Sequence, residues 1–242
     1  MTKTKSLCVY FIRHAESNNN LMHLMYGDTY EPLRLPDPPL SPPGVDQAKS
    51  LNKFVKENWL DFKFEAVFAS PMVRAIHTAQ LVSEDLEVDK AVWSDVFEAR
   101  GCRDKGKGHP GTPRHKLENM FPEFHLPSEV TDQGWYFNPK EETREEAFLR
   151  AKMVWNKLKW GNLPYKRIAL VSHGMFLNCL FTALVKKDLH LRKIHLDSKL
   201  GFFNTGVTKV VLNQGSPVID YIDRVDHLPE PPRHKGGSGN VE

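Results

Sequence analysis

The chain has 242 residues, of which 40% are apolar and 26% are charged, values typical of a globular protein with one or two domains. A chain of this length buries a sizeable core without disulfides, so collagen, a coiled coil, bulk disorder and a disulfide scaffold are excluded. The net charge is +3, from 33 Lys and Arg against 30 Asp and Glu. This surplus is too small to demand a nucleic-acid partner, although local basic patches favour anionic substrates.

The expected location of the protein follows from its apolar segments and cysteines. The sequence contains no run of about 18 apolar residues, so no membrane-spanning helix is predicted. The first residues also lack the apolar stretch and cleavage site of a secretory signal. Cys8, Cys102 and Cys179 are odd in number and scattered, as expected for reduced thiols. We therefore expect a cytoplasmic protein that does not enter a membrane.

Strand-type and helix-type patterns alternate along the first third of the chain. Leu7–Ile12 is a continuous apolar run, which predicts a strand buried on both faces. The prolines of Pro32–Pro43 predict a surface loop. Gly44–Trp59 has apolar residues three and four apart, the helical spacing. Ala66–Ala69 is a short strand, and Ser70-Pro71 predicts the cap and first residue of a second helix.

The same alternation continues in the second half of the chain. Thr143 and Glu146 have the capping-box spacing at the start of a helix. Ile168–Ser172 has the pattern of another buried strand, followed by an apolar helix over Gly174–Val185. Two late strands are predicted, Val207–Leu212 and Pro217–Ile222. The pattern predicts an α/β fold, a three-layer α/β/α sandwich with a mostly parallel sheet.

Two segments fall outside this alternation. Residues 101–135 show neither period and are too long for an ordinary connection, so we expect an insertion with a function. Residues 229–242 are rich in Pro and Gly and predict a disordered tail. We therefore expect one domain over residues 1–228, carrying the insertion.

The residues with chemical potential follow the buried strands. Arg13-His14 ends the first strand, and His173-Gly174 stands where the later strand gives way to a helix. Ligands of open α/β sheets bind at the carboxyl ends of strands, and helix N-termini attract anions. Arg74 lies in the first turn of a helix, an unfavourable place for a cation unless an anion joins it. Two guanidinium groups suit a tetrahedral oxyanion, so we expect a phosphate site here.

Several motifs occur in the order typical of one family. They are Arg13-His14-Ala15-Glu16, Asn20 six residues after His14, the segment Leu40–Ala48, the segment Ser70–Ala79, His173-Gly174 and Asn204–Thr208. Together they cover about residues 7–213, and the chain resembles the histidine phosphatase superfamily in its phosphoglycerate-mutase-like branch, branch 1. Ala15 replaces the usual glycine, which we expect to be tolerated unless the backbone needs a positive φ.

The resemblance implies phosphoryl transfer through a phosphohistidine. It assigns His14 as the nucleophile, with His173 beside it as a second catalytic histidine. The phosphate-binding residues that it implies are Arg13, His14, Asn20, Arg74, His173 and Gly174. Two arginines and a second histidine supply positive charge, so no metal and no cofactor are expected.

The general acid is also assigned by the resemblance. The family uses either an Asp directly after the second His or a Glu in the segment after the Arg helix. Gly174 occupies the first position, which leaves Asp95 and Glu98. Glu98 is favoured because Gly101 follows it shortly, as at the family's acid position. Burial near Phe97 would raise its pKa as acid catalysis requires.

The segment after this glutamate separates two activities. Phosphoglycerate mutases follow the acid with Arg-His-Tyr-Gly, whereas this chain has Ala99-Arg100-Gly101-Cys102. We therefore favour a phosphomonoester phosphatase acting on a small phosphorylated metabolite. The alternatives are a cofactor-dependent phosphoglycerate mutase and a non-catalytic phospho-ligand binding protein on the same fold. The oligomeric state is left open, with a homodimer as one option.

The insertion offers two competing interpretations. A zinc site would need a triad whose spacings of seven and six fit no usual ligand pattern, namely Cys102, His109 and His115. A nucleic-acid patch would use basic residues that no aromatic residues interleave, namely Lys105, Lys107, Arg114 and Lys116. We expect neither. We expect the insertion to cover the phosphate pocket and to select the substrate through Arg114 and Lys116.

Overall fold

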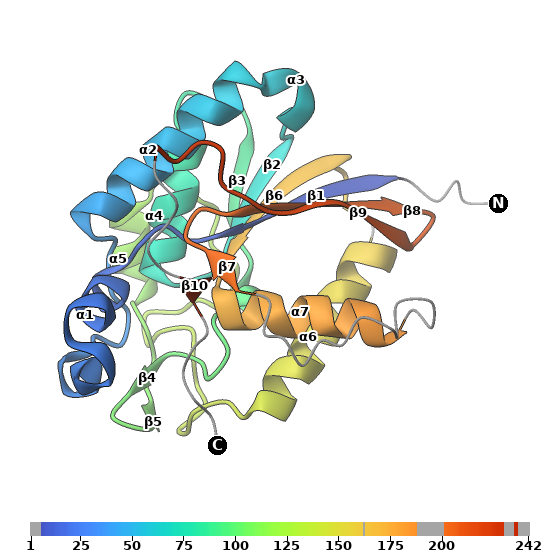
Figure 1. Ribbon diagram of the computed structural model, residues 1–242. Coiled ribbons are helices and arrows are strands. Elements are labelled where there is room, and N and C mark those ends of the chain that lie inside the picture. Colours follow the sequence, from blue (N-terminus) through green and yellow to red (C-terminus); the bar gives the residue numbers. More distant parts are fainter. Residues whose placement is uncertain (1–5, 162, 188–200, 230–234, 237–242) are drawn as a thin grey trace.

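The computed structural model describes residues 6–161, 163–187, 201–229 and 235–236. Six strands form the central sheet, in the order β3-β2-β6-β1-β8-β9. Their bounds are Leu7–Arg13 for β1, Ala66–Ala69 for β2, Asp89–Val92 for β3, Arg167–Ser172 for β6, Val207–Asn213 for β8 and Ser216–Arg224 for β9. Figure 1 shows helices α2 (Pro42–Glu57) and α4 (Val73–Val82) on one face of this sheet, and α6 (Arg144–Trp160) and α7 (Gly174–Lys187) on the other.

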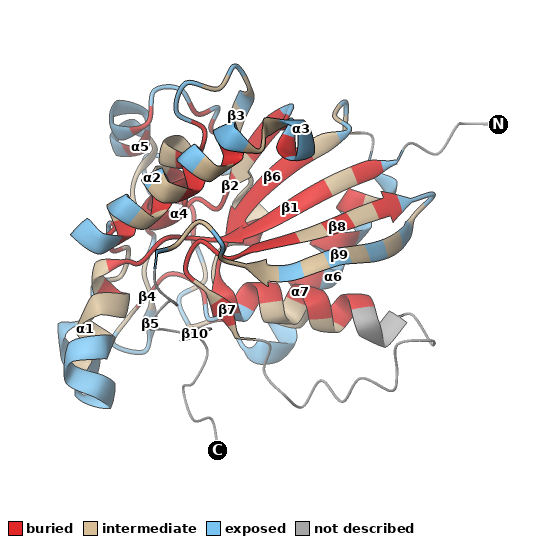
Figure 2. Cartoon of the chain, turned by 45° about the horizontal axis from the view of Figure 1, so that its top comes forward, coloured by how far each residue is buried: buried red, intermediate tan, exposed pale blue. Residues whose placement is uncertain are grey.

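Alternate residues of the central strands divide the core into two layers. Tyr10 and Ile12 of β1 pack with residues of α2 and α4, whereas Val9 and Phe11 pack with residues of α6 and α7. All four side chains have no exposed surface, and Figure 2 shows β1 buried along most of its length. Because successive strand residues point to opposite faces, the continuous apolar run is what a two-sided core needs. The predicted three-layer sandwich is confirmed.

The sheet brings the two predicted histidine segments together. β1, β6, β2 and β3 run parallel, whereas β8 is antiparallel to β1 and pairs with β9 in an antiparallel hairpin. Arg13, the last residue of β1, is in register with Ser172, the last residue of β6. His14 and His173 therefore leave neighbouring strands at the same edge of the sheet.

Helix α2 begins earlier than its apolar period indicated, at Pro42. The Ser41 side chain accepts a hydrogen bond from Gly44 N at 3.1 Å, and a proline in the first turn suits the fixed φ of that position. Glu16 holds this cap, because its carboxylate accepts from the Ser41 hydroxyl at 2.7 Å. A short helix α3 (Trp59–Phe62) follows.

Gly44→Ala should destabilise the fold. A Cβ at this position would overlap the backbone oxygen of Glu16. The clash is with backbone, which cannot move aside as a flexible side chain would. Overpacking of this kind costs about 1–3 kcal/mol, so the midpoint of thermal unfolding should fall by several degrees. Gly106→Ala is the matched control for space, because nothing lies within 4 Å of the position that its added Cβ would take, although its positive φ adds some strain of its own. Equal losses in the two variants would contradict the steric reason.

The expected cap of α4 is wrong. The helix begins at Val73 with Met72 as its N-cap residue, and the Met72 side chain makes no capping hydrogen bond. Instead, Asp37 from the proline-rich loop accepts a hydrogen bond from Val73 N at 3.0 Å. The Ser70 hydroxyl accepts from Met72 N at 3.3 Å and lies 2.7 Å from His173 Nε2, so it links the turn before α4 to the site.

Helix α1 (Asn18–Tyr26) and the 3-10 helix η1 (Gly27–Leu33) were not predicted. Asparagines are poor helix formers, but a reciprocal pair of caps starts α1. Ser17 Oγ accepts from Asn20 N, and the Asn20 side chain accepts from Ser17 N. The proline-rich loop predicted over Pro32–Pro43 is shorter than expected, because Pro32 lies within η1 and α2 already begins at Pro42.

The segment 101–135 is part of the core rather than a loop laid over it. It contains β4 (Arg103–Asp104), β5 (Lys107–Gly108) and α5 (Arg114–Met120). Its buried apolar residues join the layer beneath α2 and α4, namely Cys102, Leu117, Phe121, Phe124, Leu126, Val130 and Trp135. His125 extends the sheet beyond β3, since Val92 N donates to His125 O at 2.8 Å.

Arg114 has a structural role within the insertion. Its guanidinium donates to the carbonyl oxygens of Leu126, Pro127 and Val130 and to the carboxylate of Glu118. These bonds link parts of the insertion to one another, although one-third of the Arg114 side chain remains exposed; its part in substrate selection stays a prediction.

The remaining elements lie near the C-terminal end of the described chain. Lys235 and Gly236 form a two-residue strand, β10, that pairs with β7 (Phe202–Phe203). Two residues of the segment predicted as a disordered tail thus have defined partners, and residues 230–234 and 237–242 lie outside the described residues. Across the part of the chain that the structure describes, no helix is both long and apolar enough to span a bilayer.

Candidate active site

His14 lies in the sharp exit from β1, and its side chain is almost completely buried. Its Nδ1 donates a hydrogen bond to Ala15 O at 2.7 Å, which places the ring proton on Nδ1. Its Nε2 therefore carries the lone pair, and it accepts from Arg74 Nε at 3.2 Å. Ala15 is not among the described residues that have a positive φ, so its methyl group is tolerated as expected.

The surroundings of His14 keep its ring neutral. Burial, followed by the charges of Arg74 and Arg13, holds the pKa of His14 well below its usual 6.5. A neutral imidazole nitrogen that carries a lone pair is the form that attacks phosphorus. The His14 ring is thus in the form that nucleophilic attack requires.

The protonation of His14 is a testable consequence. Its pKa in the folded state is lower than in the unfolded state, so the unfolded chain binds more protons as the pH falls below 6.5, and the free energy of unfolding should decrease there. In the folded protein, ¹⁵N shifts of the ring nitrogens should report a neutral ring, protonated at Nδ1, well below pH 6.5. A titration of His14 near pH 6.5 would contradict this.

Two buried arginines flank His14. Arg13 donates through NH1 to Phe202 O at 2.6 Å, and burial lowers its pKa to about 10. Arg74, on the first turn of α4, is 5% exposed. Thr78 fixes that turn, because its hydroxyl donates to Arg74 O and accepts from Ala15 N. The helix that carries Arg74 is thereby attached to the backbone beside His14.

His173 is the fourth member of the cluster. Its ring centroid lies 5.0 Å from that of His14, and burial is the main cause that holds its pKa well below 6.5. Its Nε2 is 2.7 Å from the Ser70 hydroxyl. When that hydroxyl donates, the ring proton lies on Nδ1.

Three buried nitrogens of this cluster lack hydrogen-bond partners within the described residues. They are Arg13 Nε, Arg74 NH1 and His173 Nδ1. Buried donors are almost always satisfied in folded proteins, so such a group around one lone pair indicates a place for an acceptor-rich anion. A phosphoryl group, with three oxygens and negative charge, fits this set.

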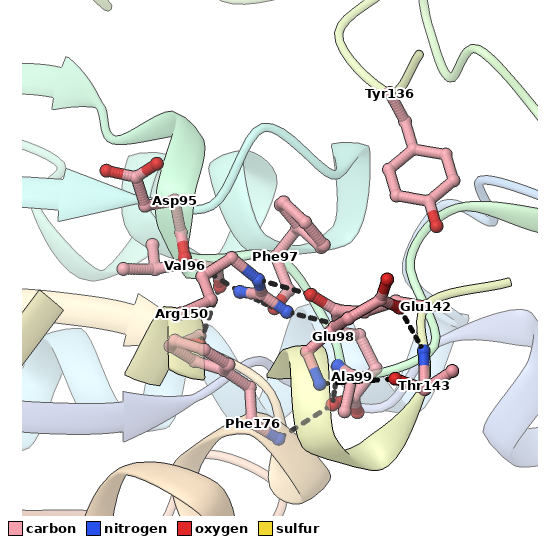
Figure 3. A network of polar contacts seen from close by, with 12 residues as sticks. Asp95, Val96, Phe97, Glu98, Ala99, Tyr136, Glu142, Thr143, Arg150 and Phe176 are labelled. Atoms are coloured by element: carbon pink, nitrogen blue, oxygen red, sulfur yellow. Dashed lines mark hydrogen bonds and ion pairs between the residues drawn. The ribbon is translucent and has the colours of Figure 1, made fainter. Parts of the chain in front are cut away.

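Glu98 closes the site from the segment after β3. Its Oε1 accepts from Ala99 N at 2.8 Å and from Phe176 N, in the first turn of α7, at 2.9 Å. Burial raises the pKa of Glu98, and the nearby charge of Arg74 and these two N–H groups oppose the rise. Figure 3 shows its carboxyl group against the start of α7.

Asp95, the other candidate acid, points away from the site. Its carboxylate forms an ion pair with Lys157 on α6 and accepts from the indole of Trp93. These partners lie on the side of the segment opposite to that used by Glu98. Geometry therefore separates two carboxylates that sequence pattern alone left as alternatives.

Asn20 and Gly174 are near the site in different ways. Asn204 Nδ2 donates to His14 O at 2.8 Å and lies 3.5 Å from Asn20 Oδ1, so Asn20 adjoins the His14 loop through Asn204. Gly174 is buried and is the first residue of α7. Its phosphate contact, like that of Asn20, stays a prediction.

Asp37 is a site-supporting residue that sequence analysis missed. Besides capping α4, it accepts from the hydroxyl of Thr112 at 2.7 Å. Burial raises its pKa, and the charge of Arg74 is the strongest influence against that rise. The signal in the sequence was weak, because an Asp between prolines is most simply explained as a turn residue.

The alternative zinc ligands are not gathered at one point. Cys102 Sγ and His109 Nδ1 are 3.8 Å apart, whereas His115 is hydrogen-bonded to Asp132 at 3.0 Å. Within the described residues, no group of three or more His, Cys, Asp or Glu side chains is arranged to hold a metal ion.

Known proteins resemble this chain in sequence and in fold. The uncharacterized phosphatase PhoE of Bacillus subtilis is 27% identical over 190 residues, 78% of this chain and 82% of that protein. Phosphoglycerate mutase-like protein 1 of Arabidopsis thaliana is 27% identical over 253 residues, covering 90% and 87%.

Solved structures show the same fold. An ecdysone phosphate phosphatase from Bombix mori superposes with a TM-score of 0.64 at 18% identity, over 98% of each chain. A phosphoserine phosphatase from Entamoeba histolytica gives 0.58 at 23% identity, over 92% of this chain and 99% of that one. The family model of the histidine phosphatase superfamily, branch 1, matches residues 9–224. This chain is therefore a member of branch 1 of the histidine phosphatase superfamily.

Proposed function

We propose that this protein is a phosphomonoester phosphatase that acts through a phosphohistidine on His14, with a small phosphorylated metabolite as substrate. One observation carries the proposal: the His14 Nε2 lone pair is held in a neutral ring beside three buried donor nitrogens without partners in the described residues. Phosphoryl transfer needs in-line positioning and neutralised oxygens, and this cluster offers both.

In the first step, His14 Nε2 attacks phosphorus while the bond from phosphorus to the ester oxygen breaks. Arg13, Arg74 and His173 donate to the phosphoryl oxygens. Glu98, in its protonated form, gives its proton to the leaving oxygen, so the alcohol departs neutral.

In the second step, water replaces the leaving alcohol. The Glu98 carboxylate takes a proton from the water as its oxygen attacks phosphorus. The bond from phosphorus to His14 Nε2 breaks, and its electron pair returns to the ring. Inorganic phosphate leaves, and Glu98 is again protonated for the next cycle.

Hydrolysis is favoured over mutase exchange by the segment after Glu98. Arg100, the cation that stands there, forms an ion pair with Glu141 and a hydrogen bond to it at 2.7 Å. Its guanidinium is thus bound by Glu141 and not by the cluster around His14. The relatives are compatible with a phosphatase, since one is a phosphatase by name and another is mutase-like. Their names do not identify the substrate of this chain.

A metabolite screen tests the reaction type. Purified protein should release phosphate from small phosphomonoesters without bisphosphoglycerate. Movement of phosphate between the carbons of phosphoglycerate, dependent on bisphosphoglycerate, would instead establish a mutase. Binding of phosphorylated ligands with no turnover of any would establish a non-catalytic protein.

Glu98→Gln should reveal the acid through the leaving group. Alkyl phosphates need their leaving oxygen protonated, so their turnover should fall on the order of 10²–10⁴-fold. An activated aryl phosphate needs little protonation and should lose less than about tenfold in its first step, measured as the burst of released phenol. Asp95→Asn is the matched control and should change neither substrate. The reverse pattern in the two variants would make Asp95 the acid.

A further inference from the structure

Arg150 lies on α6 and makes no hydrogen bond to the residues around His14, yet it is only 6% exposed. It forms a two-pronged ion pair with Glu142, with Nε and NH2 each 2.7 Å from a carboxylate oxygen, and both side chains are 8% exposed. A buried pair of this kind is costly to desolvate and is weak evidence for stability. Its contacts therefore point to a role other than stability.

The remaining nitrogen of Arg150 holds the backbone that delivers Glu98. NH1 donates to Asp95 O at 2.7 Å and to Phe97 O at 3.0 Å. The carbonyl between them, Val96 O, accepts from the Ser172 hydroxyl at 2.8 Å. All three carbonyl groups that precede Glu98 thus accept a hydrogen bond. Figure 3 shows the two that Arg150 donates.

The guanidinium also contacts the residue that donates to Glu98. Its central carbon lies 3.5 Å from the Phe97 ring centroid and 4.2 Å from that of Phe176, so the plane is held between the two rings. Phe176 N is the donor to Glu98 Oε1. Arg150 thereby bridges the segment that carries the acid and the helix that hydrogen-bonds it.

Glu142 completes the arrangement on the far side of the acid. Its backbone N donates to Arg100 O at 3.2 Å, in the turn directly after Glu98. Arg100 has a φ of 76° and Gly101 a φ of 74°, a left-handed pair that costs energy at the arginine. The pair of Arg150 and Glu142 therefore touches the chain both before and after Glu98.

We propose that Arg150, paired with Glu142, is a positioning residue that sets the Glu98 carboxyl group for proton transfer to the leaving oxygen. The proposal rests on the proposed acid role of Glu98. Arg150 touches no reacting atom; it acts through the segment 95–97 and through Phe176. A misplacement of the acid by about 1 Å can lower the rate on the order of 10²-fold. This loss should appear only with substrates whose leaving oxygen must be protonated.

Arg150→Lys tests this. A lysine keeps the charge but cannot form the two-pronged pair, the two carbonyl bonds and the ring stacking together. Turnover of an alkyl phosphate should fall about 10–100-fold, with less than about a threefold change in the burst from an activated aryl phosphate. Lys157→Ala is the matched control: it removes a cation of the same helix that pairs with Asp95, and both substrates should be unaffected.

A double-variant comparison separates the two assignments. If Arg150 acts through Glu98, then Arg150→Lys should add less than about a threefold loss in a Glu98→Gln background. If Glu98→Gln itself shows no leaving-group dependence, the acid role fails. If Glu98→Gln shows it, but Arg150→Lys lowers both substrates equally or adds its full loss to Glu98→Gln, the positioning role is overturned.

Glu142→Gln keeps the test decisive if Arg150→Lys does not fold. The amide has the volume of the carboxylate and retains one acceptor, so the arginine keeps part of its support. The same selective loss on alkyl phosphates is expected, at a smaller size, with circular dichroism confirming a native fold. An equal effect on both substrates in this variant would also overturn the positioning role.

Discussion

His14→Asn should abolish turnover of every phosphomonoester, with a loss of at least about 10⁴-fold, as expected when a nucleophile is removed. The asparagine amide has no lone pair comparable to that of the imidazole Nε2. After brief mixing with a ³²P-labelled phosphomonoester and quenching in base, the native protein should carry label that is stable in base and labile in acid, the behaviour of a phosphoramidate. The variant should carry none.

His77→Asn is the matched control for this result. His77 lies on α4 three residues after Arg74 but packs against the Phe121 ring at 6.1 Å between centroids, and it is only partly buried. Its replacement should leave both the label and the turnover within about threefold of the native protein. Label that persists after His14→Asn would remove His14 from the reaction and would turn attention to His173.

Arg74→Lys should lower kcat on the order of 10²–10³-fold, the cost of losing one preorganised donor to a transition-state oxygen. Lysine cannot donate to His14 Nε2 and to a phosphoryl oxygen from two fixed nitrogens, as the guanidinium is placed to do. Burial lowers the pKa of the Arg74 guanidinium. The same burial would lower the pKa of a lysine ammonium group by a larger amount. The variant would thus lose the fixed pair of donor nitrogens and part of the positive charge at this position.

The measurement that isolates this effect is inhibition by orthovanadate, which mimics the transferring phosphoryl group. Its inhibition constant should rise in parallel with the loss in kcat, while the protein keeps its native circular dichroism. Arg144→Lys, at an exposed position at the start of α6, should change neither quantity. A variant that keeps native vanadate affinity while kcat falls would show that Arg74 orients His14 without binding the phosphoryl group.

The layers of the fold and the pairing of the two histidine segments could be predicted because both depend on local patterns. A run such as Leu7–Ile12 is apolar at every position only if both faces are covered. Parallel strands place their carboxyl ends on one edge, so Arg13-His14 and His173-Gly174 were expected at the same edge of the sheet, and the structure shows that their strands are adjacent. The distance between the rings, and the neutral state of His14, needed the structure.

The features that sequence analysis missed or misjudged depend on contacts between distant segments. Ser70-Pro71 has the local chemistry of a helix start, but the hydroxyl meets His173, about 100 residues further on, and Asp37 caps the helix instead. Arg114 looked like a free cation until its guanidinium was seen to be used by the carbonyls around it. No local period or propensity records such partners.

The Asp37 contacts also limit how this enzyme can be engineered. Residues 101–135 look like an exchangeable module for altering substrate range, yet the Thr112 hydroxyl within them binds the same carboxylate that accepts from Val73 N, next to Arg74. A transplant that lacks a donor at position 112 would leave the Asp37 carboxylate one partner short and free to turn towards the Arg74 guanidinium. Loop grafts intended to change selectivity should therefore carry positions 37 and 112 together as one inherited unit.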